Sequence, residues 1–147
     1  MAFLSGMNIS ASGLTAQRQR LDVISENISN SNTTRTEGGD PYRRRMVVFE
    51  PRNEGSFQEI LSRTARGGTA KQQGVIVKEI IEDETEFKSV YDPTHPDADE
   101  NGYVRMPNVD LLKETIDGME ASRAYDANVT AFNAIKAMAT KGLEVGK

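Results

Sequence analysis

The stretch 92–103, DPTHPDADENGY, holds the side chains best suited to chemistry. Its segment Asp97–Gly102, DADENG, has the D-x-D-x-N-G spacing that opens a calcium-binding EF-hand loop. The twelfth position of such a loop should be a bidentate Glu, but it is Asn108, and Pro93 and Pro96 prevent a preceding helix. We therefore interpret the stretch as an acidic, proline-stiffened turn and expect no metal and no cofactor. A calcium-binding interaction module is the alternative.

The single histidine, His95, could act as a general base beside Asp92 or Asp97. A histidine between two prolines, without a nucleophile or an oxyanion-stabilising group nearby, is more typical of a structural role. The sequence also contains no phosphate-binding glycine loop and no serine-centred elbow. We expect no catalytic residue and no enzyme activity.

A run of three arginines, Arg43–Arg45, could contact phosphate groups or nucleic acid. The net charge of −4 and the lack of interleaved aromatic residues argue against nucleic acid as a partner. The run is better interpreted as a solvated strand, or as a surface that meets an acidic run such as Glu82–Glu84.

The sequence lacks several features that would indicate other classes of protein. There are no cysteines, which excludes disulfides and thiolate metal sites. The first residues, MAFLSGMNISASGL, do not have the pattern of a secretory signal peptide. Because no stretch approaches about 18 apolar residues, we expect no direct insertion into a membrane.

The last part of the chain, 107–147, is organised as one long helix. Residues that favour helices dominate it, Asn108 is a candidate N-cap, and Asp110 and Glu114 place negative charge at the positive end of the helix dipole. A helix over 109–145 would be about 55 Å long at 1.5 Å per residue. Such a length indicates a coiled coil or an assembly element.

A second long helix is expected over Phe3–Ile28, with apolar residues seven apart in two rows. In both helices the apolar residues surround the cylinder, which requires neighbours on several sides. A chain of this length offers one or two neighbours, so other subunits should supply the rest. The expected subunit-assembly residues are Met7, Leu14, Leu21, Ile24, Ile28, Leu112, Ile116, Met119, Tyr125, Val129, Phe132, Ile135 and Met138.

The middle of the chain predicts a few short strands. They are expected over 42–49, 74–81 and 85–91, with Glu82–Glu84 as a turn and a short fourth strand at Tyr103–Val104. The polar, glycine-containing segment at about 55–74 predicts a flexible loop with one helical turn at Phe57–Leu61.

The predicted fold class is mainly α. Long N- and C-terminal helices form an antiparallel coiled-coil-like pair, and a small β-rich module is inserted between them. Three parts are expected: an N-terminal helix at 1–31, the β-rich module at 32–106 and a C-terminal helix at 107–147.

Four blocks of the sequence carry a family resemblance. Residues 12–34, SGLTAQRQRLDVISENISNSNTT, resemble the N-terminal signature of bacterial flagellar rod and hook proteins. The blocks GGDPYRRR (38–45), DPTHPDADENGYVRMPNVD (92–110) and EASRAYDANVTAFNAIKAM (120–138) are similar to the proximal rod type of the flagellar basal body. The segment at about 55–74 carries no part of the resemblance.

The resemblance implies an axial structural protein of the basal-body rod, which crosses the periplasm. Such a subunit is exported without a cleaved signal peptide by the flagellar type III export apparatus. Its terminal helices would pack with those of neighbours into a helical tube that transmits torque. The implied partners are its own copies, other rod proteins and the base of the motor near the inner-membrane ring.

Overall fold

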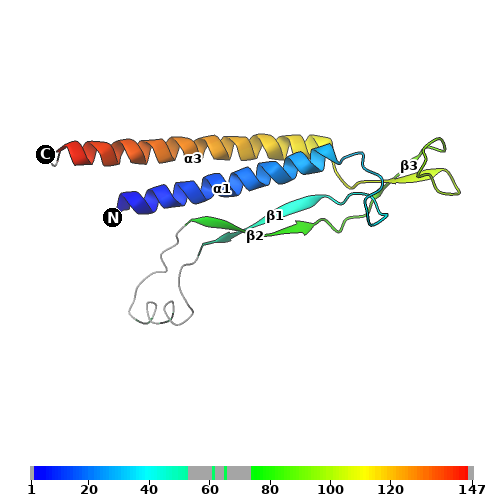
Figure 1. Ribbon diagram of the computed structural model, residues 1–147, viewed down its shortest axis with the longest axis horizontal. Coiled ribbons are helices and arrows are strands. Elements are labelled where there is room, and N and C mark those ends of the chain that lie inside the picture. Colours follow the sequence, from blue (N-terminus) through cyan, green and yellow to red (C-terminus); the bar gives the residue numbers. More distant parts are fainter. Residues whose placement is uncertain (1, 53–60, 62–64, 66–73, 146–147) are drawn as a thin grey trace.

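Two long helices and a small strand module between them make up the protein. The computed structural model describes residues 2–52, 61, 65 and 74–145. In chain order the elements are α1 Ala2–Ser29, β1 Arg45–Pro51, β2 Val75–Glu82, β3 Lys88–Tyr91, β4 Tyr103–Met106 and α3 Leu111–Val145. Both termini lie at one end of the elongated molecule, and the pair β3–β4 lies at the other end (Figure 1).

The start of α3 is capped by Asp110. Its carboxylate Oδ1 accepts hydrogen bonds from the backbone N–H groups of Leu112 at 3.0 Å and Lys113 at 3.4 Å, which have no partner inside the helix. The prediction that Asn108 is the cap is wrong. The amide of Asn108 instead accepts from Arg44 N and donates to Asp83 O, so it joins the strand module to the entry of the helix.

Helices α1 and α3 pack along their length through small residues. Early residues of α1 face late residues of α3: a Cβ added at Gly6 would lie 3.1 Å from Ile135, and one added at Gly13 would lie 2.7 Å from Asn128. Nearer the strand module, Ile24 of α1 packs on Gly118, whose added Cβ would lie 3.6 Å away. Because these positions lack side chains, the two helix backbones approach closely.

The four strands form two separate two-stranded antiparallel sheets, β1–β2 and β3–β4. The β1–β2 pair, here called the ribbon, contains a β-bulge between Val48 and Phe49. All four strands were expected, with bounds shifted by a few residues. The expected turn at Glu82–Glu84 does not join two paired strands: β2 pairs with β1, and this segment leads from one sheet to the other.

The ribbon packs against α1, so α1 lies between α3 and the ribbon (Figure 1). The inward side of the ribbon is set by Val75 and Val77, which line a cavity with Ala16 of α1. Ser12 fixes the register, since its hydroxyl accepts a hydrogen bond from Val75 N at 3.1 Å. Gly74 has φ of +102° and no room for a Cβ beside Ser12, which only glycine accommodates.

The expected loop at about 55–74, with a helical turn at 57–61, lies almost entirely outside the described residues.

Candidate functional site, an assembly surface held by a buried polar cluster

A buried polar cluster joins the two helices and the strand module. Glu114, in the first turn of α3, is fully buried. Its Oε1 accepts from Arg44 Nε at 2.6 Å and its Oε2 accepts from Asn27 Nδ2 of α1 at 2.9 Å. The three residues come from α1, from α3 and from the segment directly before β1, so this contact sets the relative placement of these parts. Asn27, Tyr42, Arg44 and Glu114 are called the polar cluster below.

Asn27 links the cluster to the first strand. Its Nδ2 also donates to Arg45 O, and its Oδ1 accepts from Arg45 N and from the Tyr42 hydroxyl, each at 2.9 Å. The Asn27 amide thereby satisfies the backbone N–H and C=O of Arg45 at the start of β1, as a neighbouring strand would. Burial raises the pKa of Tyr42 to about 12, and the negative charge of Glu26 adds to the effect. Tyr42 is therefore a hydrogen-bond donor at all ordinary pH values.

Arg44 is the cationic centre of the cluster. Besides Glu114, it faces Asp83 at 3.6 Å and Asp117 at 3.4 Å. The N–H of Thr85 and, after it, the hydroxyl of Thr85 and the charge of Arg44 hold the pKa of Asp83 below its usual value. The arginine run Arg43–Arg45 does contact the acidic run Glu82–Glu84, through Arg44 and Asp83 of the same chain. The alternative of a solvated strand is wrong for Arg44, which is buried.

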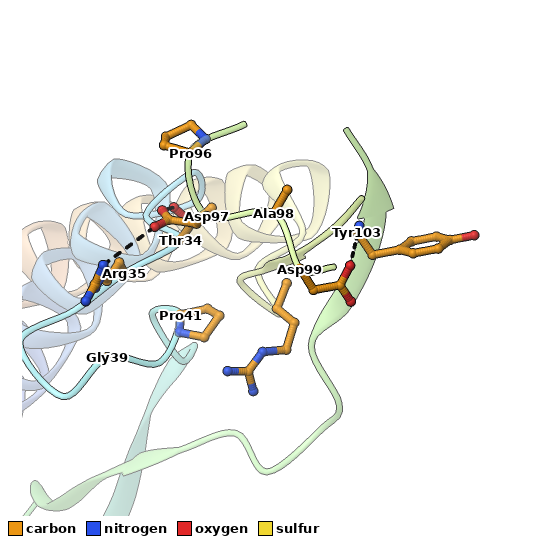
Figure 2. Close-up of a pocket in the computed structure, with 10 residues that line it drawn as sticks. Thr34, Arg35, Gly39, Pro41, Pro96, Asp97, Ala98, Asp99 and Tyr103 are labelled. Atoms are coloured by element: carbon orange, nitrogen blue, oxygen red, sulfur yellow. Dashed lines mark hydrogen bonds and ion pairs between the residues drawn. The ribbon is translucent and has the colours of Figure 1, made fainter. Parts of the chain in front are cut away.

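The calcium-like segment is occupied by internal contacts (Figure 2). Asp97 accepts from the Thr34 hydroxyl at 2.8 Å and lies 3.9 Å from Arg35. One oxygen of Asp99 accepts from the backbone N–H groups of Asn101 and Tyr103, which shapes the turn. Among the described residues no group of three or more His, Cys, Asp or Glu is arranged to hold a metal ion. The segment thus ties the β3–β4 turn to the chain that follows α1.

His95 has a structural contact of the same kind. Its Nδ1 accepts a hydrogen bond from the N–H of Asp97 at 3.1 Å, which stiffens the turn. Its backbone N–H donates to Asp92 O at 3.3 Å. The neighbouring Asp92 carboxylate accepts from the hydroxyl and the N–H of Thr94, and these bonds hold the pKa of Asp92 below its usual value.

The residues expected to mediate assembly fall into three groups by exposure. Ile24 is buried in the chain's own core. Half-buried residues follow: Met7, Leu14, Leu21, Tyr125, Val129, Phe132 and Ile135. The exposed residues are Ile28, Leu112, Ile116, Met119 and Met138. Within the described part of the chain, the side chains of the last group stay largely in contact with water, so they are the part of the set that is available to another subunit.

The buried seam between the helices is made largely of small and polar residues that the sequence analysis did not select. On α1 it includes Ser10 and Asn27, both buried, beside Gly6 and Gly13. On α3 the fully buried Ala121 belongs to it. The helix pair therefore buries small and polar residues beside Val23 and Ile24, and it also carries large apolar side chains on its outside. Exposed apolar side chains in such number are unusual for a monomer, so the outside of the pair is a candidate interface.

The polar cluster was also missed, because a hydrophobic pattern gives no signal for Asn27, Arg44 or Glu114. The sequence signal that could have indicated the polar cluster was the family resemblance. Tyr42 and Arg44 lie in the block GGDPYRRR, and Asn108 lies in the block that ends at Asp110. These blocks are the segments that meet at the cluster.

An elongated helix pair with large apolar side chains outside defines a class of axial assembly proteins. Two family models agree with this class. The model described as "Flagella basal body rod protein" matches residues 7–35. The model described as "Flagellar basal body rod FlgEFG protein C-terminal" matches residues 100–145. The matches cover most of both helices.

Comparison over the full length narrows the family. The chain is 49% identical to the flagellar basal-body rod protein FlgC of Bacillus subtilis (strain 168), with both chains covered completely. It is 42% identical to FlgC of Borreliella burgdorferi, over 99% of this chain and 98% of that one, and 40% identical to FlgC of Salmonella typhimurium over both full lengths. The chain belongs to the FlgC family of flagellar basal-body rod proteins.

Among the described residues, neither long helix has a stretch apolar enough to cross a lipid bilayer.

Proposed function

We propose that this chain is a structural subunit of the flagellar basal-body rod and forms the proximal part of its torque-transmitting shaft. The observation that carries the proposal is the exposure of Leu112, Ile116 and Met119 on α3, in a chain that is similar over its full length to rod proteins. Exposed apolar side chains at helical spacing need a partner surface. The function proposed is mechanical, and no residue is assigned to catalysis.

The proposal divides the chain into the three parts 1–31, 32–106 and 107–147. The first and last form an antiparallel, coiled-coil-like pair that serves as the axial core, and the middle part is the attached module. The pairs Gly6–Ile135, Gly13–Asn128 and Ile24–Gly118 support this arrangement, because their residue numbers rise on α1 as they fall on α3.

The assembly residues divide their work in this proposal. Ile24 and the half-buried residues hold the two helices together, while Ile28, Leu112, Ile116, Met119 and Met138 contact neighbouring subunits. The neighbours are other copies of the chain and other rod proteins, and those at the proximal end include the base of the motor near the inner-membrane ring. The subunit reaches them, across the inner membrane, through the flagellar type III export apparatus.

The polar cluster has a mechanical role in this proposal. Torque applied to the helix pair must reach the strand module without bending the joint. Directional hydrogen bonds and a close ion pair at Glu114 resist such bending better than apolar contacts, which permit sliding.

The test is complementation of a strain that lacks the gene. A variant with Leu112, Ile116 and Met119 all changed to Ser should be produced and exported but should not restore motility. A matched variant with Thr115, Ser122 and Thr130 changed to Ala, on the same helix, should restore it. Electron microscopy of isolated basal bodies should show rods with the matched variant and truncated rods with the first. Normal rods with the first variant would contradict the proposal.

A further inference from the structure

The outward side of α3 carries an apolar stripe that ends in a cation. At 100° per residue, Leu112, Ile116, Met119 and Arg123 fall within about 60° of one another, opposite the buried positions Glu114 and Ala121. The exposed fractions of the three apolar residues are 72%, 45% and 50%. Arg123 is exposed and has no ion-pair partner in the described part of the chain. These four residues are called the outer stripe.

The ribbon has a second apolar face, opposite the side chains of Val47 and Phe49. Side chains alternate without a break along β1, because the extra residue of the bulge lies in β2. Val47 and Phe49 line a cavity with Val23 of α1, which Met46 also borders. By alternation, the opposite face holds the cross-strand pairs Met46–Ile81, Val48–Glu79 and Glu50–Ile76, of which Ile76 also borders a cavity beside Ala16 of α1. This set is called the outer ribbon face.

The outer ribbon face is the kind of surface that needs a cover. Ile76 is 41% exposed and Ile81 is 38% exposed. A two-stranded sheet is at most marginally stable on its own and depends on packing against other elements, and α1 covers only one side of the ribbon. Glu79 is exposed among these apolar residues and has no ion-pair partner in the described part of the chain, whereas Glu50 lies 3.9 Å from Lys78.

The two surfaces lie on opposite sides of the molecule, because α1 separates α3 from the ribbon (Figure 1). They therefore cannot cover each other within one chain. If one copy's stripe covers the next copy's ribbon face, the pair still has one free stripe and one free ribbon face. Such a contact can repeat, and it builds a helical filament when its rotation does not close a ring.

The two surfaces match in length and in charge. Leu112 to Arg123 spans about 17 Å of helix, and Ile76 to Ile81 spans about 17 Å of strand. Helical side chains lean toward the N-terminus of their helix, so the Arg123 guanidinium extends back over the stripe. Glu79 lies inside the ribbon face rather than at its edge, within reach of a guanidinium placed there. The stripe carries one unpaired cation, and the face carries one unpaired anion.

We propose that the outer stripe of one copy docks on the outer ribbon face of the next copy, with Arg123 paired to Glu79. This inference rests on the proposed function, since it specifies which surfaces of neighbouring subunits meet. The occupant of the ribbon face is thus a second copy of this chain.

Cysteine cross-linking in assembled basal bodies tests the contact directly. The chain has no cysteine of its own, so introduced thiols are the only ones it carries. A strain lacking the gene would express I116C and I81C together, and its isolated basal bodies would be treated with a short bis-maleimide. A cross-linked species with the mass of two copies, containing both variants, is expected. The pair I81C and S89C, with Ser89 exposed on β3, is the control and should give none.

Several outcomes would overturn the contact. The first is that no two-copy species forms although both variants are present in the basal bodies. The second is that the same species forms when either variant is expressed alone. The third is that the thiols become linked to a different protein. Any of these would leave the proposed function intact, because the variants would still be incorporated into rods. If the unmodified chain itself were absent from isolated basal bodies, that result would instead contradict the proposed function.

A charge reversal provides a second test that needs no cysteine. R123E or E79R alone should reduce the chain's amount in isolated basal bodies about tenfold, and the double variant should restore it to within about twofold of the unmodified chain. K136E makes the same charge change on α3 outside the stripe and should have no effect. Failure of the double variant to recover while both single variants are depleted would overturn the pairing of Arg123 with Glu79.

Discussion

The two ends of the helix pair are built on different physical principles. At the end that meets the strand module, Asn27, Glu114 and Ala121 are at most 1% exposed and a hydrogen-bonded network surrounds them. At the terminal end, the contacts between helices involve Gly6 and Ile135, and no described side chain of α3 from residue 128 onward is buried. The first end has a single defined geometry, and the second is held by few contacts.

This difference shows how an assembly subunit can combine a fixed joint with adaptable ends. A buried ion pair such as Arg44–Glu114 contributes little net stability, because desolvation offsets the attraction, but it restricts the geometry. The terminal end lacks such contacts, and in the middle of α1 Gln17 Oε1 is buried without a hydrogen-bond partner in the described part of the chain. The terminal end is therefore able to adjust when neighbouring helices pack around it.

The largest expected effect comes from breaking the polar cluster. Glu114→Ala leaves Arg44 buried without its closest partner and should lower the free energy of unfolding by about 3–5 kcal/mol. Arg105→Ala removes the exposed pair with Asp40 and should cost less than about 1 kcal/mol. Urea denaturation followed by circular dichroism measures both. Equal costs would show that the buried polar cluster contributes no more to stability than an exposed ion pair.

The next effect is a loss of stability at high pH that depends on Tyr42. The pKa of Tyr42 is about 12 in the folded chain, against about 10 for an unperturbed tyrosine, so its contribution to stability is complete below pH 10 and is lost as pH rises toward 12. The shift corresponds to about 2–3 kcal/mol. Chemical denaturation at several pH values should show a steeper decline for the unmodified chain than for Tyr42→Phe. If stability declines with pH equally in the unmodified chain and in Tyr42→Phe, ionisation of Tyr42 does not affect the stability of the polar cluster.

A smaller effect is expected at the terminal end from filling the space between the helices. Gly13→Val would push against Asn128 and should destabilise the chain by about 2 kcal/mol. The same change at Gly142 meets nothing within 4 Å and should alter stability by less than about 0.5 kcal/mol. The thermal midpoint of each variant distinguishes the two sites. A neutral Gly13→Val would mean that the helices can separate there at no cost.

The smallest effect on the isolated chain is expected on the outside of α3. Leu112→Ala should change the free energy of unfolding by less than about 0.5 kcal/mol, since the side chain is mostly in water. Ile24→Ala, inside the core, should cost about 2–4 kcal/mol. The two substitutions are compared by denaturation in dilute protein. A large cost at Leu112 would show that its surface is already covered in the free chain.

Both long helices were predictable, because helix-forming residues and periodic apolar residues occur along their whole length. The first helix was expected at Phe3–Ile28 and is observed at Ala2–Ser29. The strand positions also followed from local composition. What composition does not contain is the pairing of strands. Nothing in Glu82–Glu84 distinguishes a hairpin turn from a segment that leads to a second sheet.

The buried seam could not be predicted for a related physical reason. Hydrophobic periodicity identifies residues that leave water because they are apolar. Gly13 and Asn27 are inside for other reasons, the first because it has no side chain and the second because it satisfies the backbone of Arg45. The N-cap prediction failed similarly, since Asn108 and Asp110 are both good caps, and the long-range contact with Arg44 decides between them.

The common position of the two chain ends has a practical consequence. A fluorescent protein fused to either terminus would report from the same extremity of the molecule, whereas a dye on Ser89 in β3 would report from the opposite extremity (Figure 1). Two colours placed in this way would reveal which extremity points toward the cell body, and so the polarity with which subunits enter the growing structure.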